Sequence, residues 1–292
     1  MSNRQRVLVA ASCPTLPKMT APPWVISDEP VIMGILNLTP DSFSDGGELD
    51  SIDAILRRAD QMRSQGAALL DLGAVSTRPG ADEVTEANEL KRLAPALEAL
   101  VKRGFGGLSV DTYRPEVAAF ALDCGASMIN DVRGGREPGM YALLGERKPW
   151  TCLMHMRGRP KTMQVGDLRS ADLIGDVSAW LTESVQHAVM AGLPLEHILV
   201  DPGIGFGKTD PQNLALTQAC GRLSQATSCP VLYGASRKSL IGRIAGIDAP
   251  QQRLAGSLSL AGAAYRAGAR VFRVHDVGQT KQFLDLERAL GS

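Results

Sequence analysis

The chain has 292 residues, of which 44% are hydrophobic, and it carries 31 basic and 31 acidic side chains. This balance provides no net charge to attract nucleic acid or an acidic membrane surface, and no apolar run approaches the ~18 residues of a membrane helix. The length suits either two medium domains or one barrel of about 250 residues.

The first 29 residues differ from the rest. They contain prolines at 14, 17, 22 and 23 and show no hydrophobic periodicity, which predicts an irregular extension over 1–29 ahead of a single domain at 30–292. The apolar stretch at 7–11 is shorter than the ~7–15 residues that a secretion signal needs. The five cysteines are scattered and form no Cys-x-x-Cys pair, which favours reduced thiols and a cytoplasmic protein over disulfides or a zinc site.

Eight short apolar runs follow. Several of the segments between them have the pattern of an amphipathic helix. The predicted strands are 31–38, 68–74, 107–112, 127–132, 150–155, 198–204, 230–236 and 271–276. Apolar residues recur at helical spacing in 52–62, 90–100 and 173–188. Glycines at 66, 125, 192 and 268 suit helix ends, and Pro115 suits a first helical turn. Eight alternating units predict an α/β protein with a (β/α)8 TIM barrel, and a doubly wound open sheet is the alternative.

Nearly every predicted strand is apolar until its C-terminal end and then becomes polar. The polar residues at these ends are Asn37, Asp71, Asp111, Thr112, Asn130, Asp131, His155, Asp201, Ser236, Arg237, Arg273 and His275. One such residue alone is usually a helix cap or a turn former. In a barrel, however, all these ends meet at the face that carries the active site, so the set predicts one binding site.

The acidic and amide members of this set predict recognition of a planar heterocycle. Asp111, Asn130 and Asp201 supply hydrogen-bond acceptors, together with one amide that can also donate. They suit a ring edge with several N–H donors. Each of them taken singly could be a buried structural group, so the prediction depends on their occurring together.

The basic residues predict that an anion such as phosphate or diphosphate binds at the same face, because arginine and lysine favour such anions. They are Arg78, Arg237, Lys238, Arg273 and His275. Residues 236–239 also stand at a strand-to-helix junction, where backbone N–H groups and the helix dipole attract an anion. A solvated basic helix start and a surface pair of Arg273 with His275 are the alternatives.

Several familiar motifs are excluded. The run GIGFGKT at 203–209 is one residue too short for a P-loop and lacks the third glycine of a dinucleotide fingerprint. There is no Gly-x-Ser-x-Gly elbow, and His155 and His275 lack helical zinc spacing. A magnesium ion needs few protein ligands when a diphosphate supplies the others, so Asn37 is a candidate for a single contact with the metal.

Two polar loops follow the first two strands. The first belongs to VIMGILNLTPDSFSDGGE at 31–48, and the second reads DLGAVSTRPGA at 71–81. Long polar loops over a barrel mouth often act as lids. Ordinary turns have a similar composition, since Pro, Asp, Ser and Gly are turn-forming residues.

Eight motifs together resemble one known family. In order they are NLTPDSFSDGG, STRPGA, SVDT, INDV, LMHMRGRPKTMQ, DPGIGFGKT, GASRKS and FRVHDV. They closely resemble the dihydropteroate synthases of the folate pathway, from about Val31 to the C-terminus. The resemblance implies a pterin-binding barrel and a transferase that condenses 6-hydroxymethyl-7,8-dihydropterin diphosphate with 4-aminobenzoate. The products would be 7,8-dihydropteroate and diphosphate, formed by early loss of diphosphate to a pterin cation and then attack by the amine.

The resemblance also assigns roles to the matching residues. Pterin binding is expected of Asp111, Asn130, Met154, Asp201, Phe206, Gly234 and Lys238. Diphosphate binding is expected of Asn37, Thr77, Arg78, Arg273 and His275. Binding of 4-aminobenzoate is expected of Phe43, Thr77, Pro79, Arg237, Lys238 and Ser239. The catalytic residues would be Asp111, Asp201, Lys238 and Arg78, with Asn37 as the ligand of Mg²⁺. A homodimer and inhibition by sulfonamides are further implications.

The second loop departs from the family pattern. Where the family usually has Gly-Gly-Glu before Ser-Thr-Arg-Pro-Gly, this chain has Gly73, Ala74 and Val75. Alanine restricts the backbone more than glycine, and valine cannot replace the contacts of a glutamate. A non-catalytic pterin-binding paralogue and a pterin-dependent methyltransferase domain therefore remain as alternatives.

Overall fold

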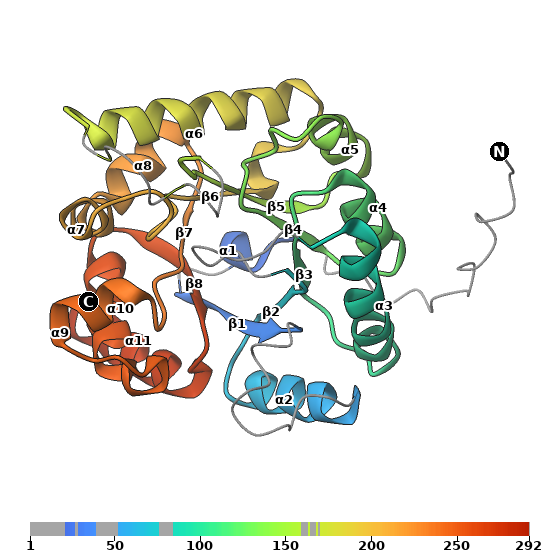
Figure 1. Cartoon of the computed structure of the whole chain (residues 1–292), viewed down its shortest axis with the longest axis horizontal. Helices are drawn as coiled ribbons and strands as arrows, with labels where there is room; N and C mark the ends of the chain where they lie inside the picture. Colours follow the sequence, from blue (N-terminus) through green and yellow to red (C-terminus); the bar gives the residue numbers. More distant parts are fainter. Residues whose placement is uncertain are drawn as a thin grey trace, which may run out of the picture.

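The computed structural model describes residues 21–26, 29–38, 52–75, 84–158, 163, 168 and 170–291. Within them, eight parallel strands close into a barrel in chain order, and helices surround it (Figure 1). The strands are β1 (Val31–Asn37), β2 (Leu69–Gly73), β3 (Leu108–Asp111), β4 (Met128–Asp131), β5 (Trp150–Met154), β6 (Ile198–Asp201), β7 (Val231–Tyr233) and β8 (Ala269–Val274). Because β8 pairs with β1, the TIM barrel is confirmed and the open sheet is excluded.

The helices of the described residues alternate with these strands. They are α1 (Pro23–Ile26), α2 (Ile52–Ser64), α3 (Glu86–Lys102), α4 (Pro115–Asp123), α5 (Met140–Arg147), α6 (Leu173–Met190), α7 (Asp210–Gln218), α8 (Cys220–Thr227), α9 (Ser239–Ala245), α10 (Leu254–Arg266) and α11 (Val277–Gly291). Two short 3₁₀ turns cover Leu195–His197 and Pro250–Gln252.

Helix ends follow the signals in the sequence. Pro115 is the first residue of α4, where its missing N–H is no loss. Glycines 66, 125, 192 and 268 follow helices and have φ between 98° and 106°, a backbone region that glycine adopts without steric cost. Thr209 begins α7 with a reciprocal capping box to Gln212.

The strands end earlier than predicted. β6 stops at Asp201, and Pro202, which has no N–H to donate, follows it. β8 covers Ala269–Val274 rather than 271–276, so His275 lies just beyond the strand. Some of the polar residues predicted at strand ends, such as Asp201, therefore lie within the strands. Others, such as His275, are the first loop residues at the barrel mouth.

Two apolar cores lie on the two faces of the barrel wall. Outward-facing residues such as Leu70, Val110 and Val200 pack with the surrounding helices. The inner core fills the barrel interior toward the N-terminal ends of the strands. It consists of Trp24, Val31, Met33, Leu69, Met128, Trp150, Cys152, Leu199, Leu232 and Val271. This division follows from strand geometry, because successive side chains point to opposite faces.

The inner core is covered at the N-terminal end of the strands by α1, which Figure 1 shows in the middle of the ring of strands. Trp24 is 4% exposed, its ring lies edge-on to Trp150 with centroids 5.7 Å apart, and its Nε1 donates to the carbonyl of Glu196 at 3.3 Å. The short helix α1 thus lies within the segment 1–29, which was expected to be irregular. Burial of Trp24 stabilises this helix. Residues 1–20 and 27–28 of that segment lie outside the described residues.

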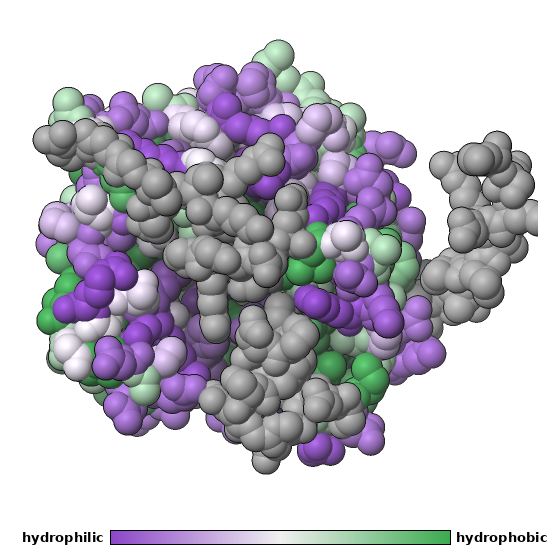
Figure 2. Space-filling model, viewed as in Figure 1, coloured by the Kyte–Doolittle hydropathy of each residue, from purple (hydrophilic) through white to green (hydrophobic). Residues whose placement is uncertain are grey.

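On the face that Figure 2 shows, the coloured residues are mostly hydrophilic, and apolar residues stand among them in small groups. None of the described helices combines the length and the apolar character needed to span a membrane. Among the described cysteines, Cys152, Cys220 and Cys229 are buried free thiols, and Cys124 is also buried. Cys13 lies outside the described residues.

Candidate active site

The inward-facing positions of the strands change from apolar to polar toward the C-terminal end. On four strands a polar residue stands two positions beyond an inner-core residue, namely Leu69 to Asp71, Met128 to Asn130, Leu199 to Asp201 and Val271 to Arg273. Asp111 continues the inward series of β3 two residues after Ser109. Because side chains repeat faces every two residues, these polar groups lie directly above the inner core.

Arg273 links the acidic groups at this end. Its Nε donates to Asp71 Oδ2 at 2.6 Å, and a terminal nitrogen donates to Asp111 Oδ2 at 2.9 Å. Asp71 is fully buried and Asp111 is 9% exposed. Charge-assisted hydrogen bonds of this kind are about twice as strong as neutral ones, so the guanidinium of Arg273 on β8 is held across β1 by carboxylates on β2 and β3.

Asp71 also holds two neutral donors. Ser109 Oγ donates to Asp71 Oδ1 at 2.6 Å, and Asn130 Nδ2 donates to Asp71 Oδ2 at 3.1 Å. A carboxylate can only accept, so the amide of Asn130 must direct its nitrogen toward Asp71. Its oxygen is then the atom left for a ligand.

Asp111 and Asp201 have raised pKa values. Burial raises the pKa of Asp111 to about 7; Arg273 opposes this effect, and the charges of Asp71, Glu89 and Asp131 add to it. Burial likewise raises the pKa of Asp201, against the lowering effect of Lys238. Both carboxylates therefore gain when a ligand donates hydrogen bonds to their charged form.

Lys238 contributes positive charge from the loop after β7. Burial lowers its pKa to about 8, while the nearby charge of Asp201 raises it. Its Nζ donates to the carbonyl of Ile204 and lies 4.5 Å from the ring centroid of Phe206. The structure thus brings Lys238, Asp201 and Phe206 together, as the sequence analysis expected.

A second lysine, Lys208, holds the loop at 203–208 in place through hydrogen bonds to backbone carbonyls. Lys208 is 1% exposed, and its Nζ donates to the carbonyls of Gly203 at 2.9 Å, Phe206 at 3.0 Å and His155 at 3.4 Å. Burial lowers the pKa of Lys208 to about 7. Lys208 therefore shapes the segment that carries Phe206.

Arg237 and His275 lie at the edge of the site. Arg237 makes a two-pronged ion pair with Asp276, at 3.0 and 2.5 Å, and adopts the left-handed region with φ of 58°. Ser236 Oγ lies 3.1 Å from His275 Nδ1. Ser239 is exposed and begins α9. In this structure Arg237 has a carboxylate partner, so its expected contact with 4-aminobenzoate stays a prediction.

The remaining described residues of the expected set are Asn37, Met154 and Gly234. A Cβ added to Gly73 would lie 3.5 Å from Asn37 Oδ1 and 3.9 Å from Asp111 Oδ2, so Gly73 separates those two side chains. A Cβ on Gly234 would lie 3.7 Å from Asp201 Oδ2 and 3.8 Å from Arg273 Cβ. Met154 is buried at the end of β5, in register with Asp201. The two glycines keep space open between the polar groups.

Four expected residues, Phe43, Thr77, Arg78 and Pro79, lie outside the described residues. The start of their second loop is described. Ala74 is 2% exposed, packs in the outer core and accepts a hydrogen bond from Arg92 at 3.0 Å. It is not among the residues with positive φ, so replacing the family's glycine causes no backbone strain at this position.

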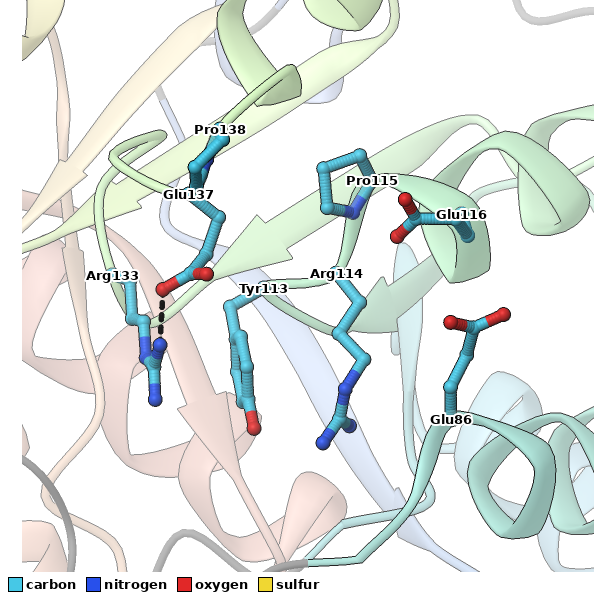
Figure 3. A pocket seen from close by; sticks show the side chains of 8 residues that line it. All are labelled: Glu86, Tyr113, Arg114, Pro115, Glu116, Arg133, Glu137 and Pro138. Atoms are coloured by element: carbon cyan, nitrogen blue, oxygen red, sulfur yellow. Dashed lines mark hydrogen bonds and ion pairs between the residues drawn. The ribbon is translucent and has the colours of Figure 1, made fainter.

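A separate pocket of about 400 Å³ lies beside the site, on the loops that follow β3 and β4 (Figure 3). Arg114 and Arg133 lie over the ring of Tyr113, with their guanidinium carbons 4.8 and 4.0 Å from its centroid. Arg114 pairs with Glu89, and Arg133 with Glu137. Since both cations already have carboxylate partners, this pocket offers no strong anion site, and no residue expected from the sequence lines it.

The described residues contain no group of three or more His, Cys, Asp or Glu side chains placed to hold a metal ion. Magnesium, however, commonly uses one or two protein oxygens and the phosphates of a substrate. Asn37 ends β1 beside Asp111, across Gly73. A single amide oxygen at this position fits that kind of magnesium binding.

The sequence analysis assigned no role to Asp71, Ser109, Lys208 and Asp276. Asp71 was recognisable as a charge at the end of an apolar strand, and Ser109 shares the face of Asp111 because the two are two residues apart. Lys208 carried no distinguishing signal, since its partners are backbone carbonyls.

Comparison with known proteins gives a consistent result. Residues 33–275 match the family of pterin-binding enzymes. Dihydropteroate synthase of Escherichia coli K12 is 41% identical over 260 residues, which cover 89% of this chain and 91% of the relative. The enzyme of Synechocystis is 42% identical over 261 residues, which cover 89% of each chain.

Solved structures are equally similar. A Yersinia pestis dihydropteroate synthase with a sulfonamide drug complex has a TM-score of 0.85 and 41% identity, over 90% of this chain and 94% of the other. Xanthomonas albilineans dihydropteroate synthase in complex with 7,8-dihydropteroate has a TM-score of 0.80 and 38% identity, over 91% of this chain and 95% of the other.

Proposed function

This chain belongs to the family of pterin-binding enzymes, and we propose that the polar cluster at the barrel mouth performs its reaction. The chain is a dihydropteroate synthase, a transferase of folate biosynthesis. It joins 6-hydroxymethyl-7,8-dihydropterin diphosphate to 4-aminobenzoate and releases diphosphate.

One observation carries the assignment of the site. Acceptors on β3, β4 and β6 and cations on β8 and the loop after β7 face the same interior space. Asp111, Asn130 and Asp201 accept hydrogen bonds from the N–H groups of the pterin. Lys238 donates to the ring, and Met154 and Phe206 contact it.

Bond cleavage proceeds with early loss of diphosphate. Positive charge develops on the pterin, and Asp111 and Asp201 stabilise it electrostatically. Arg273 and His275 stabilise the departing diphosphate together with Arg78. Arg273 is bound to Asp111 in this structure, so its terminal nitrogen exchanges that carboxylate for the substrate while Nε stays on Asp71.

The amine of 4-aminobenzoate attacks last. Phe43, Thr77, Pro79 and Ser239 form its site beside Lys238 and Arg237. Because the two loops after β1 and β2 complete this site, 4-aminobenzoate binds after the pterin, and water is kept from the cation. Tight binding of 4-aminobenzoate to the enzyme alone, without pterin or diphosphate, would contradict this order.

Asn37 would hold a magnesium ion, which when bound would neutralise charge on the diphosphate. The enzyme works in the cytoplasm as a homodimer and is inhibited by sulfonamides. The buried free thiols support the location, and exposed apolar side chains such as Met190, which is 82% exposed, support the dimer.

The test is magnesium-dependent release of diphosphate from the pterin diphosphate, with and without 4-aminobenzoate. We expect release that is coupled to formation of dihydropteroate. Binding of pterin without coupled release would contradict the proposal and indicate a non-catalytic paralogue, in which Ala74 and Val75 would be the first residues to examine.

A further inference from the structure

Asp71 is the most enclosed charge of the site, and the family resemblance assigns it no contact with a substrate. It is fully buried on β2, and both of its oxygens accept hydrogen bonds. We propose that Asp71 is the positioning residue of the pterin site, which holds the amide of Asn130 and the guanidinium of Arg273 in the orientations that the pterin diphosphate requires. This inference rests on the function proposed above.

The first step concerns Asn130. An asparagine amide can present either its oxygen or its nitrogen to a ligand, and the two ends differ little in shape. The 3.1 Å bond from Nδ2 to Asp71 removes this freedom, because the carboxylate accepts only. Asn130 therefore presents an acceptor, which suits an N–H of the pterin and rejects a ring carbonyl at that position.

The second step concerns Arg273. Its two bonds differ in surroundings: the bond to Asp71 ends on a fully buried carboxylate, whereas Asp111 is 9% exposed. Asp111 is also the carboxylate expected to accept from the pterin. The bond to Asp71 is thus the fixed anchor, and the bond to Asp111 is the one that a substrate replaces.

The third step concerns Ser109. Its hydroxyl donates to Asp71 Oδ1 at 2.6 Å from the neighbouring strand. This bond leaves Oδ2 for Asn130 and Arg273. Asp71 is therefore oriented from one side by Ser109 and orients two residues on the other.

The experiment compares Asp71→Asn with Asp131→Asn in the full-length enzyme. Asp131 is also fully buried at the end of a strand, but it accepts from the backbone N–H groups of Arg133 and Gly135 in the following loop. The sequence pattern grouped Asp131 with the barrel-mouth residues, but it directly follows the inward-facing Asn130, so its side chain points to the opposite face of β4. It therefore matches Asp71 in burial and chemistry without contacting Arg273. Both variants are checked by thermal unfolding before kinetics.

For Asp71→Asn we expect kcat/KM for the pterin diphosphate to fall by about 10- to 100-fold, as for loss of one charged hydrogen bond. The affinity for 6-hydroxymethylpterin, measured by calorimetry, should fall in parallel. The KM for 4-aminobenzoate should change by less than about threefold. Asp131→Asn should leave both pterin parameters within about threefold of wild type.

A pH profile separates positioning from a merely structural role. The charges of Arg273, Asp71, Glu89 and Asp131 act on the pKa of Asp111, and Lys238 also interacts with Asp111; the charge of Asp71 raises the pKa of Asp111. Asp71→Asn should therefore shift the acidic limb of kcat/KM to lower pH. The charge of Asp131 raises the pKa of Asp111 less than the charge of Asp71 does. Asp131→Asn should therefore shift the acidic limb less.

Equal effects of the two variants, or pterin kinetics of Asp71→Asn within threefold of wild type, would overturn the inference. If Asp71→Asn does not fold, Ser109→Ala replaces it. That variant should raise the KM for the pterin diphosphate at least threefold with little change in Tm, and an unchanged KM would overturn the inference. A wild-type enzyme without activity would instead contradict the proposed function.

Discussion

The two ends of the barrel interior are built from the same strands but differ in chemistry. At the N-terminal end, inward-facing side chains such as Met33, Leu69 and Leu199 pack beneath Trp24. Two residues further along the strands, the same face carries Asp71, Asp201 and Arg273. A step of about 6.6 Å along a strand thus separates residues that stabilise the barrel from the polar residues of the candidate site.

Burial therefore has opposite energetic effects at the two ends of the barrel interior. Burial of apolar groups at the N-terminal end stabilises the fold by about 25 cal/mol per Å² of buried surface. At the C-terminal end, burial raises the pKa values of Asp111 and Asp201, so their charged forms are less stable in the folded protein than in water. Substitutions at the two ends should accordingly separate activity from stability.

Asp111→Ala should have the largest effect. Loss of this charged acceptor should lower kcat/KM by about 100- to 1,000-fold, because binding of the pterin is lost. Since the raised pKa marks an unfavourable buried charge, Tm should change by less than about 3 °C. Steady-state kinetics and calorimetry check this, and near-normal affinity for the pterin would refute the assignment.

Trp24→Ala should have the opposite profile. Removing the aromatic ring that covers the inner core should destabilise the protein by about 3 kcal/mol and lower Tm by about 6–10 °C. KM values for both substrates should stay at wild-type levels. Val25→Ala is the control, because Val25 is 54% exposed on the same helix and should cost less than about 0.5 kcal/mol.

The raised pKa of Asp111 should appear in the pH dependence of activity. Asp111, with a pKa of about 7, binds the pterin as the ionised acceptor. Below pH 7 it becomes protonated, so kcat/KM for the pterin diphosphate should fall by up to tenfold per pH unit. The same profile for Asp111→Asn serves as the control, and an unchanged acidic limb in that variant would exclude Asp111 as its origin.

His155 should give the smallest effect, on stability alone. Burial and the charge of Lys208 lower the pKa of His155 from 6.5 to about 2. Below pH 6.5 the unfolded chain binds a proton that the folded chain does not, so stability falls as the pH decreases from 6.5 toward 2. The slope is at most about 1.4 kcal/mol per pH unit.

Urea unfolding at pH 7.5 and 5.5, for wild type and His155→Gln, measures this slope. The wild type should lose about 1 kcal/mol more than the variant over this interval. Equal losses would show that His155 is protonated in the folded protein as readily as in the unfolded chain.

Much of the site was predictable from local patterns. The change from apolar to polar residues at strand ends identified Asp111, Asn130, Asp201 and Arg273 as members of one face, because side-chain alternation is a property of each strand by itself. Eight such strands also predicted the barrel and hence the face on which those residues meet. The position of Lys238 at the same end of the barrel as Asp201 followed once that face was known.

Only the tertiary structure decided which charges pair. Arg273 and Asp71 are 202 residues apart in the chain, and β1 lies between their strands in the closed barrel. Arg237 pairs with Asp276, 39 residues away in the chain, and Trp24 covers the inner end of the barrel from a segment without periodicity. Sequence spacing carries no information on such contacts, since they depend on where distant elements are brought together by closure of the sheet.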